Sequence, residues 1–115
     1  MVTYIATVYA KPGHEDQVTA HYKNLEPLLA EAKGFQSRKI YRAMPGTMAV
    51  EIRKRLPPEK LVGHPDGTDQ GTHFIVIENW DSVEDRVAFA LGAGRSKDLI
   101  EHLHNQHTHE FYEEV

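Results

Sequence analysis

The chain has 115 residues, a formal net charge of −4 and no cysteine. This length suits a single compact domain, and a domain this small gains stability from dimerisation. The lack of cysteine excludes disulfides and thiolate chemistry, and the acidic balance gives no basic surface for nucleic acid or an anionic membrane. The first residues show no basic leader before an apolar run, and no stretch is long enough to span a bilayer, so we expect a cytoplasmic protein.

The first part of the chain predicts a strand, a helix and a second strand. Val2 to Ala10 is rich in β-branched and aromatic residues, and a Lys-Pro-Gly turn ends this strand. From Glu15 to Lys33 apolar residues recur at helical spacing, with Gly34 placed to end the helix. Pro27 lies inside that helix, so we expect a kink or a break there. Phe35 to Arg42 alternates loosely and predicts the second strand.

The middle of the chain has the least regular pattern. Met48 to Leu56 places Met48, Val50 and Ile52 on one side and charged residues on the other, which favours a short strand. Pro57 to Thr72 is rich in Pro, Gly and Asp and predicts a long loop. Loops of this length in a compact domain are often functional or mobile.

The last part of the chain predicts a strand, two helices and a closing strand. His73 to Trp80 gives the clearest strand pattern. Ser82 to Asp85 resembles a capping box and begins a helix that a Gly-Ala-Gly sequence interrupts at Gly92. We expect a further helix from Ser96 to about Gln106, and alternation from Thr108 to Val115 predicts the closing strand.

This order of elements is the split pattern of a ferredoxin-like α+β fold, strand, helix, strand, strand, helix, strand, with an insertion at about 43–72. Its antiparallel sheet carries the helices on one face. Both faces of the predicted sheet are apolar, since Tyr4 and Val8 point one way while Ile5 and Tyr9 point the other. A second copy packed sheet against sheet would cover the free face, so we expect a homodimer with an apolar pocket for a small-molecule substrate.

Two motifs resemble the antibiotic biosynthesis monooxygenase (ABM) family of the dimeric α+β barrel superfamily. They are TVYAKPGHEDQV, from Thr7 to Val18, and FIVIENWDSVED, from Phe74 to Asp85. The likeness covers Val2 to Arg42 and His73 to about Asn105, and the segment Ala43 to Thr72 has no counterpart. The resemblance implies one ABM-like domain over residues 1–115 and a homodimer with a pocket between sheet and helices. For some members it also implies oxygenation of phenolic or quinol-like polyketides without flavin, metal or haem.

Other relatives with this fold degrade haem, isomerise small sugars or lactones, or have no known activity. The haem-degrading branch carries an Asn in the first strand and a His in the helix after the Trp, and the corresponding positions here are Ala6 and about Ala90. The resemblance therefore favours a cofactor-independent monooxygenase that acts on an aromatic or polyketide-like small molecule. An isomerase or cyclase of the same fold and a non-catalytic small-molecule-binding protein are the alternatives.

Three residues are candidates for catalysis. Oxygenation without a cofactor needs a base, donors that hold a developing oxyanion and walls that exclude water. Histidine is the best base near neutral pH. His21 lies at the edge of the apolar stripe of one predicted helix, and His107 lies on the stripe of another. Glu78 is a carboxylate in an apolar strand, which is costly unless it is paired. The structural alternatives are a backbone hydrogen bond for His21 and, for Glu78, a pair with Arg38, Lys39 or a cation of the partner subunit.

Four aromatic residues are candidates for substrate binding: Trp80, Tyr4, Tyr41 and Phe74. Trp80 is either a core anchor or a pocket wall that directs its indole N–H at a substrate oxygen. The strand tyrosines either pack with a wet hydroxyl or hold a phenolate.

Four histidines gather between His102 and His109. In a helix His102 and His104 point apart, whereas His104 and His107 could share an ion if the helix continues that far. His107 and His109 could share a face if both lie in a strand, but we expect the helix to end between them. A zinc site needs further ligands at a fixed geometry, and no such partners recur. We therefore expect no metal site, and no cofactor.

Overall fold

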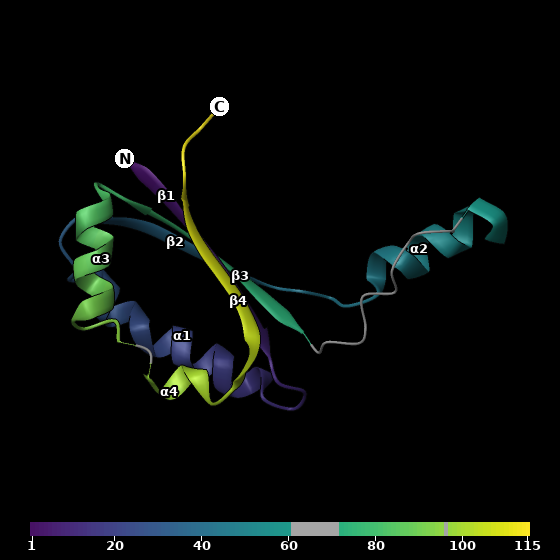
Figure 1. The fold of residues 1–115 in the computed structure, drawn as a ribbon, viewed down its shortest axis with the longest axis horizontal. Helices are drawn as coiled ribbons and strands as arrows, with labels where there is room; N and C mark the ends of the chain where they lie inside the picture. The colour runs from purple at the N-terminus through teal and green to yellow at the C-terminus, as the bar shows by residue number, and fades with distance from the viewer. Residues whose placement is uncertain (61–71, 96) are drawn as a thin grey trace.

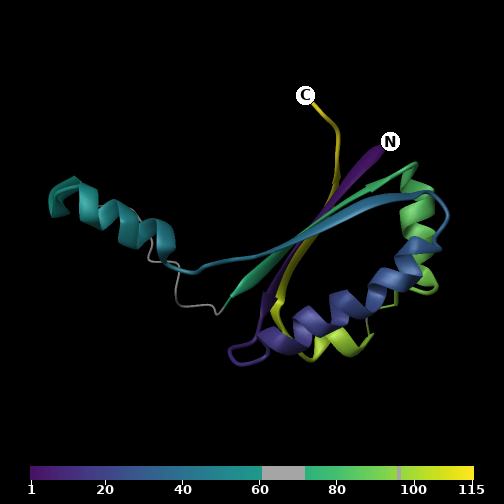
Figure 2. The ribbon, with the colours of Figure 1, turned by 180° about the vertical axis from the view of Figure 1, so that it is seen from behind.

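The computed structural model describes residues 1–60, 72–95 and 97–115. Its strands are β1 (Val2–Ala10), β2 (Phe35–Arg42), β3 (His73–Trp80) and β4 (Leu103–Tyr112), and its helices are α1 (Glu15–Ala30), α2 (Thr47–Arg55), the 3₁₀ turn η1 (Pro58–Lys60), α3 (Val83–Leu91) and α4 (Lys97–Ile100). The strands form one antiparallel sheet in the order β2-β3-β1-β4, which is the predicted ferredoxin-like α+β fold. Helices α1, α3 and α4 lie on one face of this sheet, and α2 lies beyond the end of the β2 and β3 strands (Figures 1 and 2).

The predictions for β1, β2, β3 and α3 are confirmed. The three strands have the predicted bounds, and α3 ends at Leu91 as expected. The hydroxyl of Ser82 accepts a hydrogen bond from the backbone N–H of Asp85 at 3.1 Å, so this serine caps the first turn of α3. Helix α1 ends at Ala30 and continues through Pro27, so of the two predicted alternatives, a kink or a break, the break is wrong.

The prediction of a strand from Met48 to Leu56 is wrong, because this segment forms α2. A helix satisfies its own backbone groups, whereas a strand here would need a partner strand. Glu51 also pairs with Arg55 at 2.6 Å, one helical turn away. Most of the predicted loop from Pro57 to Thr72 lies outside the described residues.

The prediction of a helix from Ser96 to about Gln106 is also wrong. Helix α4 ends at Ile100, and β4 already begins at Leu103. Pairing along β1 explains the difference, since Leu103 lies opposite Ala10 and His107 lies opposite Val8. β4 forms hydrogen bonds with the backbone of β1 on the edge that faces away from β3. These bonds outweigh the local helical pattern of the sequence.

The alternation predicted for β1 and β3 is confirmed, and it gives the sheet two distinct faces. The inner face lies under the helices and carries the buried side chains of Ala6, Val8, Ala10, Phe74, Val76 and Trp80. Half-buried Ile5, Ile75 and Ile77 lie on the outer face. No helix in the described part of the chain covers that face (Figure 2). Among the described residues, no helix has the length and apolar character needed to cross a membrane.

Candidate functional site

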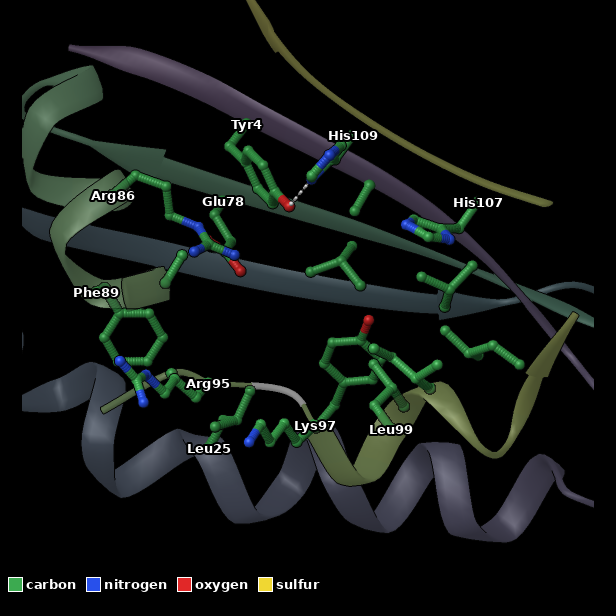
Figure 3. A pocket seen from close by; sticks show the side chains of 18 of the residues that line it. Tyr4, Leu25, Glu78, Arg86, Phe89, Arg95, Lys97, Leu99, His107 and His109 are labelled. Carbon is green, nitrogen blue, oxygen red and sulfur yellow. Dashed lines mark hydrogen bonds and ion pairs between the residues drawn. The ribbon is translucent and has the colours of Figure 1, made fainter. Parts of the chain in front are cut away.

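A cavity of about 480 Å³ lies between the inner face of the sheet and helices α1, α3 and α4 (Figure 3). We call it the helix-side pocket. Its walls are mainly apolar and include Val8, Leu25, Val76, Phe89, Leu99 and Leu103. A few polar groups from the strands and α3 enter this apolar space, which is the usual composition of a small-molecule site. Ala6 and Ala90, the two positions compared above with the haem-degrading branch, also line it.

Glu78 enters the pocket from β3 and is held by two partners. It is only 3% exposed. Nε of Arg86, on α3, lies 2.7 Å from Oε1 of Glu78. The Arg86 N–H does not point along a hydrogen-bond direction, so the contact is an ion pair and not an aligned hydrogen bond. The indole N–H of Trp80 donates to the same oxygen at 2.8 Å. These two contacts offset the cost of burying the carboxylate.

Among the cations that the structure describes, the one that pairs with Glu78 is therefore Arg86, and the predicted alternative of a pair with Arg38 is wrong. Arg38 lies opposite Glu78 in the register of β2 and β3. Its guanidinium instead donates to the backbone carbonyl of Tyr22 at 2.8 Å. Helix α3 can reach Glu78 because Arg86 lies on the same helical face as Phe89, three residues later, and both line the pocket.

Arg86 connects this ion pair to Tyr4 and His109. The guanidinium carbon lies 4.2 Å from the centre of the Tyr4 ring, which is a cation–π contact. The Tyr4 hydroxyl lies 3.4 Å from Nδ1 of His109. Burial raises the pKa of Tyr4, and the nearby Arg86 charge opposes this only in part, so the phenol keeps its proton at neutral pH. When Nδ1 of His109 carries the proton and donates to Tyr4, Nε2 remains a proton acceptor.

Three predicted site residues line the helix-side pocket: Tyr4, Glu78 and His107. His107 and His109 are alternate residues of β4 on the inner face, and their ring centres lie 5.9 Å apart. Sequence reasoning missed Arg86 and His109. The unpaired charge of Glu78 signalled a nearby cation but not the element that carries it, and continuous alternation through β4 would have placed His109 beside His107.

The other predicted substrate-binding residues lie outside this pocket. Trp80 is fully buried behind it, and its N–H is bonded to Glu78, so the prediction that it points at a substrate oxygen is wrong. Tyr41 is exposed and lies opposite Ile75, on the outer face of the sheet. Phe74 lines a separate cavity of about 380 Å³ beside β2. These positions remove the three side chains from direct contact with a ligand in the helix-side pocket.

His21 also lies outside the pocket lining. Its Nε2 is buried and has no hydrogen-bond partner among the residues that the structure describes. Burial lowers the pKa of His21 below its ordinary value, and the nearby carboxylate of Asp98 opposes this shift. A half-buried neutral imidazole on α1 therefore describes this residue better than a base that faces the pocket.

The lowered pKa of His21 predicts an acid-sensitive contribution to stability. As pH falls through about 6.5, the unfolded chain takes up a proton on this residue before the folded chain does, so the free energy of unfolding decreases. The loss stops growing once the pH is below the folded pKa. We expect His21→Gln to lose less stability than the wild type between pH 7.5 and pH 5.5 in urea titrations. An equal loss in both proteins would show that His21 does not carry this effect.

The remaining histidines do not form a recognisable metal centre in the described part of the chain. Nδ1 of His14 and Nδ1 of His102 lie 2.9 Å apart and join the turn before α1 to the turn before β4. No third His, Asp or Glu within residues 1–60, 72–95 and 97–115 completes a set of metal ligands. The contact between His14 and His102 is therefore a hydrogen bond between two turns.

Comparison with known proteins points to one family. The family model described as antibiotic biosynthesis monooxygenase matches residues 1–113. A protein of Bordetella bronchiseptica, named as a predicted antibiotic biosynthesis monooxygenase, is 17% identical with a TM-score of 0.67, over 99% of this chain and 96% of that one. A variant of SnoaB from Streptomyces nogalater, named as a cofactor-independent oxygenase, is 13% identical with a TM-score of 0.62, over 98% and 91%. A conserved protein of Methanosarcina mazei is 11% identical with a TM-score of 0.68, over 99% and 92%. No curated protein gives a significant match.

Proposed function

The chain belongs to the antibiotic biosynthesis monooxygenase family, and from this premise we propose that its helix-side pocket oxygenates an aromatic or polyketide-like small molecule without a bound cofactor. The observation that carries the proposal is the pair formed by Tyr4 and His109 at the wall of an apolar pocket. This arrangement supplies a base and a hydrogen-bond donor beside a surface that a flat apolar ligand can cover.

In the proposed first step, Nε2 of His109 takes a proton from a phenolic or enolic substrate. The Tyr4 oxygen accepts a hydrogen bond from Nδ1–H of His109 and so holds the imidazole in the tautomer that leaves Nε2 free. The hydroxyl hydrogen of Tyr4 is then available to the substrate oxyanion, and the guanidinium of Arg86 adds positive charge beside the Tyr4 ring. A flat substrate would lie against the apolar walls of the pocket, with its acidic group at the exposed imidazole of His109.

In the proposed second step, the anion gives one electron to O₂, and the two radicals combine to form a carbon–oxygen bond. The resulting hydroperoxide loses water. For a substrate such as 1,8-dihydroxyanthrone, the ring CH₂ becomes C=O, one oxygen atom enters the product and the other leaves as water. The substrate supplies all four electrons that O₂ requires, so no flavin, metal or external reductant enters the balance.

The test is oxygen uptake with 1,8-dihydroxyanthrone, using protein that has been treated with a chelator and freed of flavin. We expect one O₂ consumed per substrate, at a rate well above that of the uncatalysed oxidation. Turnover of a substrate without O₂ would instead favour an isomerase or cyclase. Binding without any turnover would favour a small-molecule-binding protein, and either result would contradict the proposal.

We also propose that the protein is a homodimer that packs through the outer face of the sheet. Half-buried Ile5, Ile75 and Ile77 and exposed Tyr41 and Tyr112 support this, because they form an apolar surface that no described helix covers. Sedimentation equilibrium is expected to give twice the chain mass of 13.1 kDa. The chain mass itself at micromolar concentration would contradict the dimer.

A further inference from the structure

We propose that the substrate of the helix-side pocket carries a carboxylate or an equivalent anionic group, which binds at Arg95 and Lys97. This inference rests on the proposed function in one respect, namely that the helix-side pocket is the substrate site. It adds a chemical class: a fused aromatic molecule with an oxidisable ring at one end and a negative charge at the other.

The charges that line the pocket are the first observation. Three cationic side chains, those of Arg86, Arg95 and Lys97, line it with one carboxylate, that of Glu78. The whole chain has a net charge of −4. The pocket is therefore positive although the protein is negative, and a positive site of this kind attracts anionic ligands.

The pairing of these charges is the second observation. Glu78 is already held by Arg86 and by the Trp80 N–H, so it does not neutralise the other two cations. Neither Arg95 nor Lys97 forms an ion pair with any carboxylate of the described residues. Two cations at the pocket thus have no acidic partner in this part of the protein.

The positions of the cations are the third observation. Nε of Arg95 donates to the carbonyl of Leu91 at 2.9 Å, and this bond holds the arginine at the end of α3 beside the pocket. Figure 3 shows Arg95 and Lys97 on the side of the pocket nearer α1, whereas Tyr4 and His109 lie on the sheet side. A ligand that spans the pocket would meet the base at one end and the cations at the other.

The size and walls of the pocket define the rest of the ligand. A volume of about 480 Å³ falls within the usual range for sites that bind drug-sized molecules. Leu25, Phe89 and Leu99 provide apolar contacts between the two ends. A fused-ring aromatic body with a terminal carboxylate matches this order of apolar and charged surfaces.

Because Arg95 and Lys97 are exposed, we expect their contribution to the affinity for an anionic ligand to be moderate and sensitive to salt. We expect the wild type to bind anthraquinone-2-carboxylate about ten-fold more tightly than anthraquinone-2-carboxamide at low salt. The two probes differ in charge and share their ring system, so the ratio isolates the charge.

The test is isothermal titration of both probes with the wild type and with the double variant Arg95→Gln/Lys97→Gln. The variant is expected to reduce the preference to about two-fold or less while it leaves the affinity for the carboxamide unchanged. The control variant Lys54→Gln/Arg55→Gln removes two cations of α2, outside the pocket, and is expected to keep the full preference.

Equal affinity for both probes in the wild type, binding of neither probe, or an undiminished preference in Arg95→Gln/Lys97→Gln would overturn the inference. The titration needs no turnover, so its result is separate from the oxygen-uptake test. A retained carboxylate preference without oxygen uptake would overturn the proposed oxygenase activity alone.

Discussion

Replacing Arg86 with methionine is expected to lower the free energy of unfolding by about 3 kcal/mol or more, because Glu78 would lose its counterion while it remains buried. The side chains of Glu78 and Arg86 are 3% and 14% exposed, so water cannot easily replace the lost charge. Methionine keeps much of the arginine stem volume, and the loss therefore reports the missing charge more than a cavity.

Urea titration at a fixed protein concentration measures this effect. The control is Arg55→Met, which removes an exposed cation that pairs with Glu51 on α2 and should change stability little. The double variant Glu78→Gln/Arg86→Met is expected to recover much of the loss, because glutamine is neutral and its amide oxygen can still accept the Trp80 N–H. An Arg86→Met protein as stable as the Arg55→Met control would show that the ion pair is not required for folding.

Replacing His109 with glutamine is expected to reduce kcat for oxygenation by about 100-fold or more, which is the usual loss when a general base is removed. Glutamine can still hydrogen-bond with Tyr4, so the affinity for substrate should change little. The rate is measured as oxygen uptake with 1,8-dihydroxyanthrone, and the affinity is measured separately with anthraquinone-2-carboxylate.

Two matched variants control this experiment. His73→Gln changes a histidine on the outer face, where its ring lies beside that of Tyr9, and should leave kcat unchanged. His107→Gln changes the neighbouring histidine of β4 in the same pocket and is expected to have a smaller effect than His109→Gln. If His107→Gln abolished turnover and His109→Gln did not, the base would be His107.

The parts of the fold that could be predicted are those in which local pattern and tertiary pairing agree. β1 and β3 alternate along their whole length, so their bounds and their two faces follow from the sequence. Ser82 caps α3 through a bond made within four residues. α2 could not be predicted because the apolar and charged residues from Met48 to Leu56 fit a strand and a helix equally well. The start of β4 at Leu103 was not predicted because it depends on pairing with β1, which is distant in the sequence.

Two of the three predicted residues that line the pocket lie in strands with clear alternation, whereas the third, His107, was predicted on a helix and lies in β4. Tyr4 and Glu78 were identified because the faces of β1 and β3 are unambiguous. Tyr41 was misplaced because β2 pairs with β3 through an irregularity after Phe35, so the face of a β2 residue depends on the register. His109 was missed because the predicted boundary of β4 separated it from His107. Arg86 was missed because only the packing of α3 on the sheet brings it to Glu78.

Oxygenation in the presence of ¹⁸O₂, followed by mass spectrometry of the product of 1,8-dihydroxyanthrone, tests the central chemistry most directly. With protein free of metal and flavin, we predict that one ¹⁸O atom enters each product molecule and that His109→Gln slows this enzymatic labelling by about 100-fold or more. A product whose new oxygen comes from water, or labelling that requires an added flavin or metal, would contradict the account.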